Sequence, residues 1–467
     1  MNLKNILIIT RTLPHSAFRI ESRRCVFKKL DNDSHVTGLV TDILNHMPEP
    51  SVSQRKELDS GLTVIFEPMP WLKTASASLL LPVGSVTDPE GLDGSSAVLA
   101  EWMQRGTRKM NSRAFSDSLD ALGARHGGSA GREYTTFGIS CLASVLPEAL
   151  KLIAESIRDP RFDQGEFPGA QAVVVQERAS LADHPDQRLF EKLGTTFFSS
   201  SHGRSPYGTE EGLKALTPTI IKNDYWRRVS PKGAILGIAG GLSWETVIKA
   251  AESNFGNWKQ KGSANPPSVS VAPRTYVHSQ EDINQVQIGL AFETTAPNSP
   301  FWYHHVIGLQ VLSGSTGSRL HTEVREKRGL VYSVGASTRA LKDFSYVVGY
   351  AGTKPDRASE TLRVVQDELS KMRKGINKEE LERAKTGLLS SLVLQGESSG
   401  ARATALTQDA YLRGRSRSLD EIHKKITVLS LDEVNQYLFA LPAPSPTVVT
   451  LGPVRLQGKI ETDRTLP

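Results

Sequence analysis

The residue types that most often bind metals or act as nucleophiles are poorly spaced for either task in this 467-residue chain. Its two cysteines, Cys25 and Cys141, lie far apart and form no C-x-x-C motif, which argues against a thiolate zinc site and a disulfide framework. The adjacent His304 and His305 have no acid at metal-ligand spacing. His126 precedes two glycines, a pattern that predicts a turn, so we expect it to be a loop residue and not a metal ligand.

A glycine-rich segment at residues 84–107 contains Ala97, Ala100 and Glu101 within the sequence Ala-Val-Leu-Ala-Glu. In its glycines and its closing Gly-Thr, this segment resembles the first-helix region of the insulinase, pitrilysin and mitochondrial processing peptidase family, M16. Active members carry His-x-x-Glu-His there, because histidines about one turn apart share a helix face and bind one zinc ion. The glutamate between them acts on the zinc-bound water.

By this resemblance, Ala97 and Glu101 replace the two histidines, and Ala100 replaces the general base. The family's third ligand is a glutamate roughly 75 residues downstream, and Glu177 matches its place. Two carboxylates alone would form a weak, water-rich site that suits hard cations better than zinc. We interpret Glu101 and Glu177 as ordinary helix-surface or ion-pair residues, and we expect neither a catalytic residue nor a bound metal in this chain.

A second candidate site lies around Arg325 and Tyr332. On the residues alone, this is a charged helix end closed by Gly329, followed by a strand on which Tyr332 packs locally. Residues 314–334, however, are similar to the region where the same family uses an Arg and a Tyr to hold substrate carbonyls. A guanidinium and a phenol can both donate to a carbonyl oxygen or a developing oxyanion. The resemblance therefore implies that Arg325 and Tyr332 bind substrate.

The elements that must position these residues are predicted to form two similar halves. Apolar runs at 62–66 and 75–83 predict strands, and strand-like segments follow one another as hairpins at 134–142 and 344–352. Helical segments repeat in the same order in both halves, with Thr217 and Ser430 as matching N-caps. We predict an α+β fold of two tandem similar halves, each an antiparallel sheet with helices on one face. The resemblance implies the LuxS/MPP-like metallohydrolase fold.

A stretch rich in Pro, Ser and Gly lacks apolar periodicity and is the best candidate for a domain boundary. We predict an N-terminal extension over 1–55, a first half with a degenerate zinc site over 56–260, a linker over 261–273 and a second half over 274–467. Whether residues 1–55 belong to the mature protein is left open.

Composition excludes several classes of function. The net charge of +6 is dispersed, and short basic clusters at 371–374 and 413–417 lack the interleaved aromatics typical of nucleic-acid binding. No apolar run is long enough to cross a membrane, so we expect a soluble protein. We favour a cytoplasmic location. The first thirty residues carry seven Lys and Arg against one acid, so a mitochondrial location is the alternative.

The family resemblance implies a non-catalytic subunit that positions a peptide for a zinc-bearing partner of the same family. Zinc is then expected in the partner, and the peptide is expected to add as a strand at a sheet edge. One alternative is a structural, core-type subunit of a respiratory bc1 complex. Another is an active zinc metalloendopeptidase with unrecognised ligands, although no ligand spacing supports it.

Overall fold

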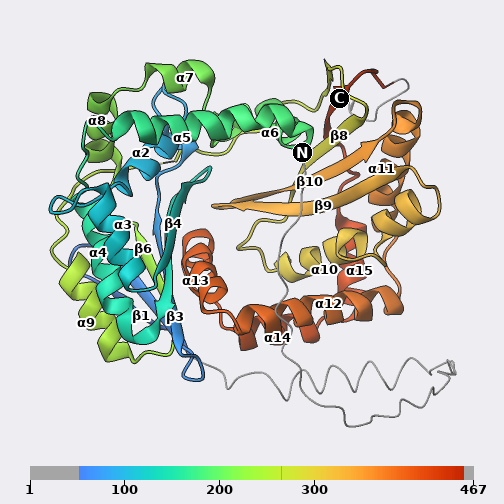
Figure 1. Ribbon diagram of the computed structural model, residues 1–467. Coiled ribbons are helices and arrows are strands. Elements are labelled where there is room, and N and C mark those ends of the chain that lie inside the picture. The colour runs from blue at the N-terminus through green and yellow to red at the C-terminus, as the bar shows by residue number, and fades with distance from the viewer. Residues whose placement is uncertain (1–51, 265, 457–467) are drawn as a thin grey trace, which may run out of the picture. The chain divides into compact units, whose positions relative to one another are not determined.

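The computed structural model describes residues 52–264 and 266–456, and these residues form two β-sheets with their helices (Figure 1). Most of the predicted N-terminal extension, residues 1–55, lies outside the described residues. The first sheet has the order β1-β2-β6-β3-β5-β4. Its strands are β1 (Gln54–Glu57), β2 (Thr63–Pro68), β3 (Thr74–Leu81), β4 (Arg125–Ala130), β5 (Thr135–Leu142) and β6 (Ile235–Gly240).

The second sheet repeats this arrangement with the order β7-β11-β8-β10-β9. Its strands are β7 (Tyr276–Gln280), β8 (Val286–Thr294), β9 (Val331–Leu341), β10 (Phe344–Thr353) and β11 (Thr447–Gly452). In both sheets the last strand of the half inserts between the first two main strands, and a hairpin, β4–β5 or β9–β10, forms the opposite edge. The predicted α+β fold with two similar halves is therefore confirmed.

Each sheet is antiparallel except for one pair. β6 runs parallel to β2, and β11 runs parallel to β7. The hairpin-like succession of strands along the sequence predicted the antiparallel pairs only. The parallel pairs join strands far apart in the chain, and no local pattern signals such a pairing.

Helices and strands follow one another in a similar order in both halves, but the helix after the last strand of the first half has no counterpart among the described residues of the second. The first half contains α2 (Ser95–Met103), α3 (Ser112–Ala121), α4 (Leu146–Arg158), α5 (Phe167–Ser180), α6 (Pro185–Phe197), α7 (Glu210–Ala215), α8 (Pro218–Arg228) and α9 (Trp244–Phe255). The second contains α10 (Trp302–Ser313), α11 (Ala358–Met372), α12 (Lys378–Gly396), α13 (Ser399–Arg413), α14 (Leu419–Thr427) and α15 (Leu431–Ala440). The matching N-caps are confirmed, since Thr217 accepts from Ile220 N and Ser430 from Glu433 N.

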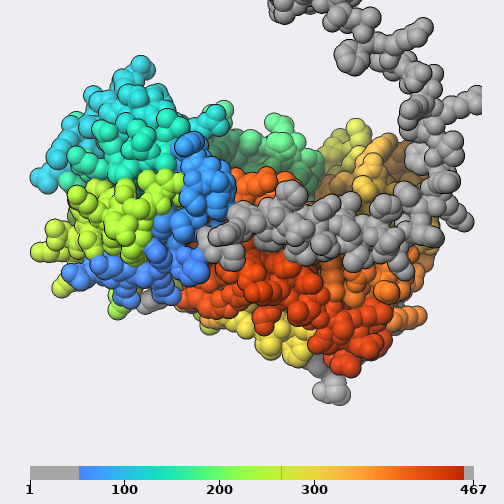
Figure 2. All heavy atoms as spheres, turned by 90° about the horizontal axis from the view of Figure 1, so that it is seen from below, coloured from blue at the N-terminus to red at the C-terminus, as the bar shows by residue number. Residues whose placement is uncertain are grey.

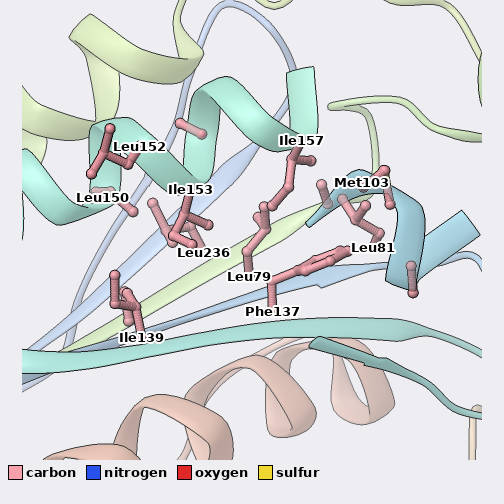
Figure 3. Close-up of a cluster of buried hydrophobic side chains, with 14 of the residues drawn as sticks. Leu79, Leu81, Met103, Phe137, Ile139, Leu150, Leu152, Ile153, Ile157 and Leu236 are labelled. Carbon is pink, nitrogen blue, oxygen red and sulfur yellow. The ribbon is translucent and has the colours of Figure 1, made fainter. Parts of the chain in front are cut away.

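Alternation along the strands explains how the first sheet buries both of its faces. On β3, Leu79 and Leu81 point into a core that also contains Ile153 and Ile157 of α4 (Figure 3). Each such buried aliphatic side chain contributes about 1.5–3 kcal/mol relative to an exposed one. Leu80, between them, points to the other face and belongs to a separate cluster.

A helix from the opposite half covers the second face of each sheet. α13 lies against the first sheet and α6 against the second (Figure 1). Leu406, Ala410 and Tyr411 of α13 pack on the first sheet, and Leu189 and Leu193 of α6 pack on the second. In each half, the helices that pack on their own sheet lie on a single face of it, as predicted. Because α6 and α13 occupy equivalent places in the two halves, this exchange is symmetric.

Polar contacts fix α13 against the first sheet. Arg402 donates to both carboxylate oxygens of Glu67 on β2 at 2.8 and 2.6 Å, and both side chains are buried. Beyond the end of α13, Gly414 O accepts from Arg55 Nη1 of β1 at 2.8 Å. Figure 2 shows the orange-red atoms of the C-terminal part of the chain directly against the blue atoms of the first described strands.

The predicted domain boundaries remain a prediction. β6 and α9 precede the segment 261–273, and β7 follows it. Within the described residues, no helix has the length and apolar character needed to cross a membrane.

Candidate functional site

The start of α2 is held in place by a buried polar network. Gly94 caps the helix with a φ of +101°, a conformation that favours glycine. Asp88 accepts from the backbone N–H groups of Gly94 at 2.9 Å and Ser96 at 3.0 Å, and it pairs with the buried Arg228 at 3.1 Å. Burial raises the pKa of Asp88, and Arg228 opposes this shift. These contacts fix the start of the helix that contains Ala97, Ala100 and Glu101.

The positions of the zinc motif carry no metal-binding pair. Ala100 is buried, and Ala97 is partly buried against the core of the first half. Glu101 accepts from Arg105 Nη2 at 2.9 Å, one helical turn along α2. The structure brings Glu177 on α5 close enough to Glu101 for their charges to interact. Burial, together with the negative charge of Glu101, raises the pKa of Glu177.

Arg105 forms ion pairs with two carboxylates around these positions. Besides Glu101, it contacts Glu166 Oε2 at 3.3 Å, so one guanidinium links α2 to the residue that precedes α5. The sequence analysis allowed an ion pair for Glu101 but did not name Arg105 or Glu166. The four-residue spacing of Glu101 and Arg105 is a visible signal for an ion pair, but the approach of Glu166 depends on tertiary packing.

A zinc ion does not fit this donor set. Among residues 52–264 and 266–456, no group of three or more His, Cys, Asp and Glu could hold a metal. One of the two matching carboxylates, Glu101, is already engaged by a fixed positive charge, which disfavours a cation beside it. We derive no hydrolytic step through a metal in this chain.

The prediction that His126 lies in a glycine-rich loop is wrong. It lies on strand β4, because the two glycines after it adopt an extended conformation and pair with β5. Its ring lies 6.0 Å from that of Phe115, edge to face. Burial lowers the pKa of His126, although the charge of Asp120 opposes this shift.

His305 has a structural place. Its ring nitrogens lie 3.0 Å from Thr294 Oγ1 on β8 and 2.6 Å from Thr338 Oγ1 on β9. Burial lowers its pKa to about 4, so the ring is neutral at pH 7 and bridges two strands.

Arg325 lies in a short π-helix, η5 (His321–Glu326). Lys327 and Arg328 both pair with Glu323, at 2.6 and 2.7 Å. Arg325 is exposed and has no carboxylate partner within the described residues, and its only polar contact is His321 Nε2, 3.3 Å from Nη1. Of the three cations in this segment, Arg325 alone keeps its charge available for a ligand.

Tyr332 lies at a β-bulge on the edge strand β9. Ser333 pairs with Gly352 and Val331 with Thr353, so Tyr332 is the extra residue and has no partner on β10. Bulges often redirect a side chain out of a sheet. The Tyr332 side chain is 72% exposed, so it does not pack locally as the alternative interpretation held.

A tight turn joins these two residues. Gly329 has a φ of +58°, and Leu330 N donates to Val324 O at 3.0 Å. The strand β9 contacts η5 directly after this turn. Both retained positions therefore lie at local irregularities, a π-helix and a bulge, of the kind that recur at functional sites.

Comparisons with known proteins agree with this architecture. Residues 63–210 match the family model described as Insulinase (Peptidase family M16), and residues 216–388 match the one described as Peptidase M16 inactive domain. The second match begins before α8, which still belongs to the first half, and ends within α12. The chain belongs to peptidase family M16.

Curated relatives match over nearly their whole length. The uncharacterized zinc protease YmxG of Bacillus subtilis is 25% identical over 403 residues, which cover 84% of this chain and 98% of the relative. An uncharacterized zinc protease of Rickettsia bellii is 25% identical over 405 residues, covering 86% and 98%. Those names belong to the relatives, whereas Ala97 and Ala100 here leave the motif positions without donors.

Solved structures show the same fold. A peptidase M16 inactive domain from Pseudomonas fluorescens matches with a TM-score of 0.77 and 20% identity, over 88% of this chain and all of that chain. A protease from Helicobacter pylori matches with a TM-score of 0.79 and 20% identity, over 86% of this chain and all of that chain.

Proposed function

We propose that this chain is a non-catalytic subunit that positions a peptide for a zinc-bearing partner of family M16. A single contrast supports the proposal. Arg325 and Tyr332 are presented to solvent with their donors free of acidic partners, whereas Ala97, Ala100 and an ion-paired Glu101 cannot form a hydrolytic centre. Donors that hold a substrate carbonyl would contribute to cleavage in this chain only if another chain supplied the metal.

The edges of the two sheets are suited to hold an extended peptide. β4 and β9 are equivalent strands, and each pairs on one side only, with β5 and with β10. Unpaired backbone N–H and C=O groups at such an edge can accept an added strand. At Gly127 on β4, a Cβ atom would meet nothing within 4 Å, so a peptide could approach this edge closely.

Arg325 and Tyr332 would then act on the peptide's carbonyl groups. A guanidinium donates from a fixed planar fork, and a phenol donates a single hydrogen bond to an oxygen that gains negative charge. In this proposal the partner contributes the zinc-bound water, and this chain contributes orientation of the scissile carbonyl.

The test is to purify the chain alone and together with a candidate family partner that carries an intact His-x-x-Glu-His motif. Zinc content and peptide cleavage are measured for each chain and for the pair. We expect zinc at stoichiometric amounts only in the partner, and full cleavage only in the pair.

Two results would contradict the proposal. Stoichiometric zinc and cleavage in the lone chain would favour an active zinc metalloendopeptidase. Full activity of the partner alone, with this chain recovered in a respiratory complex, would favour the structural bc1-type role.

A further inference from the structure

A small cavity with two positive charges and no acid lies on the face of the second sheet that α6 covers. Its volume is about 280 Å³. Most of its lining is apolar or aromatic and comes from α6 and from strands of the second sheet. The lining residues are Arg132, Phe190, Leu193, Gly194, Phe197, Ala291, Arg339, Tyr346 and Val348.

Arg132 comes from the connection between β4 and β5 and is held rigidly. Its carbonyl oxygen accepts from Val86 N at 3.0 Å, and the next residue, Glu133, accepts from Lys342 N of the β9–β10 hairpin at 2.9 Å. The guanidinium lies 5.4 Å from the ring centre of Phe198. Its Nη1 is buried and has no hydrogen-bond partner, an arrangement that native proteins rarely leave without a ligand or water.

Arg339, on β9, also lines the cavity, and the residue is otherwise exposed to solvent. It pairs with Tyr346 of β10, which also lines the cavity, and no acid within the described residues forms an ion pair with it. Two arginines from different halves thus line one largely apolar cavity, and neither forms an ion pair within residues 52–264 and 266–456.

This lack of compensation distinguishes the cavity from its larger neighbour along α6. That neighbour, about 670 Å³, is also lined by arginines, but each has an acid. Arg188 pairs with Glu281 at 2.9 Å, Arg204 with Asp93 at 3.3 Å, and Arg178 with Glu191.

The alternation of β9 places Arg339 on the same sheet face as Leu341, which packs with α6. Ser333 lies on that face too, beside the bulged Tyr332. Tyr332 and Arg339 are seven residues apart, which corresponds to roughly 23 Å along an extended strand. A peptide that follows β9 would reach the cavity about seven residues from the group held by Tyr332.

We propose that this cavity binds the C-terminal carboxylate of the substrate peptide and its apolar last side chain, an inference that rests on the proposed function. A C-terminal residue carries a carboxylate and a side chain on one carbon, which matches two guanidinium groups set in an apolar lining. Guanidinium groups bind carboxylates through short, charge-assisted hydrogen bonds. An apolar residue with a free carboxylate is therefore the favoured occupant.

The test compares labelled peptides of one sequence that end in leucine, either as the free acid or as the amide. Binding to the full chain is measured by fluorescence anisotropy. We expect the free acid to bind about tenfold more tightly, and Arg339→Gln or Arg132→Gln to reduce this preference to near unity. Arg415→Gln, which removes an equal charge from a surface pair with Glu421, should leave the preference unchanged. Equal affinities for acid and amide in the unaltered chain would overturn the proposal.

A third peptide, amidated but with an internal aspartate, tests which carboxylate is bound. If it binds as tightly as the free acid and loses affinity in Arg339→Gln, the assignment to the C-terminus is wrong.

A small probe separates this proposal from the proposed function. N-acetyl-leucine and its amide are titrated into the full chain and followed by NMR. One outcome is that the acid binds selectively, that Arg339→Gln abolishes this binding, and that Arg325→Ala does not change peptide binding. That outcome would support the carboxylate site in the cavity and contradict the proposed function. Peptide binding that needs Arg325, with neither probe binding nor acid preference, would do the reverse.

Discussion

Arg105 sets the electrostatics at the degenerate zinc position. It pairs with Glu101 and with Glu166, whereas Glu177 forms no ion pair among the described residues and lies near the negative charge of Glu101. A carboxylate in that situation takes up a proton more readily when the chain is folded. This provides a measurable signature at the residue scale.

We predict that Glu177 titrates above its ordinary pKa of 4.5, because burial and Glu101 both disfavour its charged form. The folded state then binds this proton more tightly than the unfolded state, so stability falls as pH rises through the interval above 4.5. The carboxyl group is only partly shielded and the residue as a whole is exposed, so solvent screens the effect. Glu177→Gln should therefore raise the free energy of unfolding at pH 7 by only about 0.3 kcal/mol. NMR titration of the carboxyl group checks the shift. An unchanged pKa in Glu101→Gln would contradict the assigned role of Glu101.

Tyr332→Phe should lower the turnover of the reconstituted pair. In the proposed function it removes a donor to a developing oxyanion while keeping the ring, and losses of about 100-fold in kcat are typical of such donors. Because Tyr332 is exposed, thermal unfolding should be unchanged. Tyr207→Phe, another exposed tyrosine, is the matched control. Equal turnover in both variants would remove Tyr332 from the proposed site.

At the scale of elements, the contact between α13 and β6 depends on the absence of a side chain. A Cβ atom on Gly237 would lie 2.6 Å from Ala403 O. Gly237→Ala should therefore reduce the free energy of unfolding by about 2 kcal/mol through overpacking. Gly127→Ala on β4 meets no atom within 4 Å and should change stability by less than about 0.5 kcal/mol. Urea denaturation of both variants tests the contrast, and similar losses in the two would contradict it.

Local signals predicted the elements but not their long-range partners. Apolar runs and capping residues located β2, β3, α8 and α15, because those signals are properties of a few adjacent residues. The exchange of α6 and α13 between halves was not predicted, since both helices show the amphipathic pattern of any surface helix. The turn predicted at His126 failed because strand pairing overrode the preference of the two glycines after it.

The same limit applies to the sites. Family resemblance predicted a substrate contact at Arg325 and Tyr332, and this stays a prediction; the π-helix and the bulge in which they lie have no sequence signature. Arg132 and Arg339 lie in different halves, and only tertiary structure brings them into one cavity.

At the scale of the whole molecule, Arg402 and Glu67 join the second half to the first sheet through a buried, two-fold hydrogen-bonded ion pair. Arg402→Ala would leave Glu67 buried without its partner, and we expect a loss of about 3–5 kcal/mol in the free energy of unfolding. The double variant Glu67→Gln/Arg402→Met should recover much of this loss, because no charge is then buried alone. Chemical denaturation measures both. A loss below about 1 kcal/mol in Arg402→Ala would show that the pair does not hold the halves together.

One kinetic comparison tests most directly the proposal that this chain and a zinc-bearing partner divide the work of peptide cleavage. In the reconstituted pair, kcat/KM for a peptide is measured with Arg325→Ala and with Arg328→Ala in this chain. Both variants remove one positive charge from the same turn, but Arg328 pairs with Glu323, whereas Arg325 has no acidic partner in the part of the chain that the structure describes. We predict a loss of about 100-fold for Arg325→Ala and less than about threefold for Arg328→Ala, with zinc content unchanged. Equal activity of Arg325→Ala and the unaltered pair would contradict a substrate-positioning role.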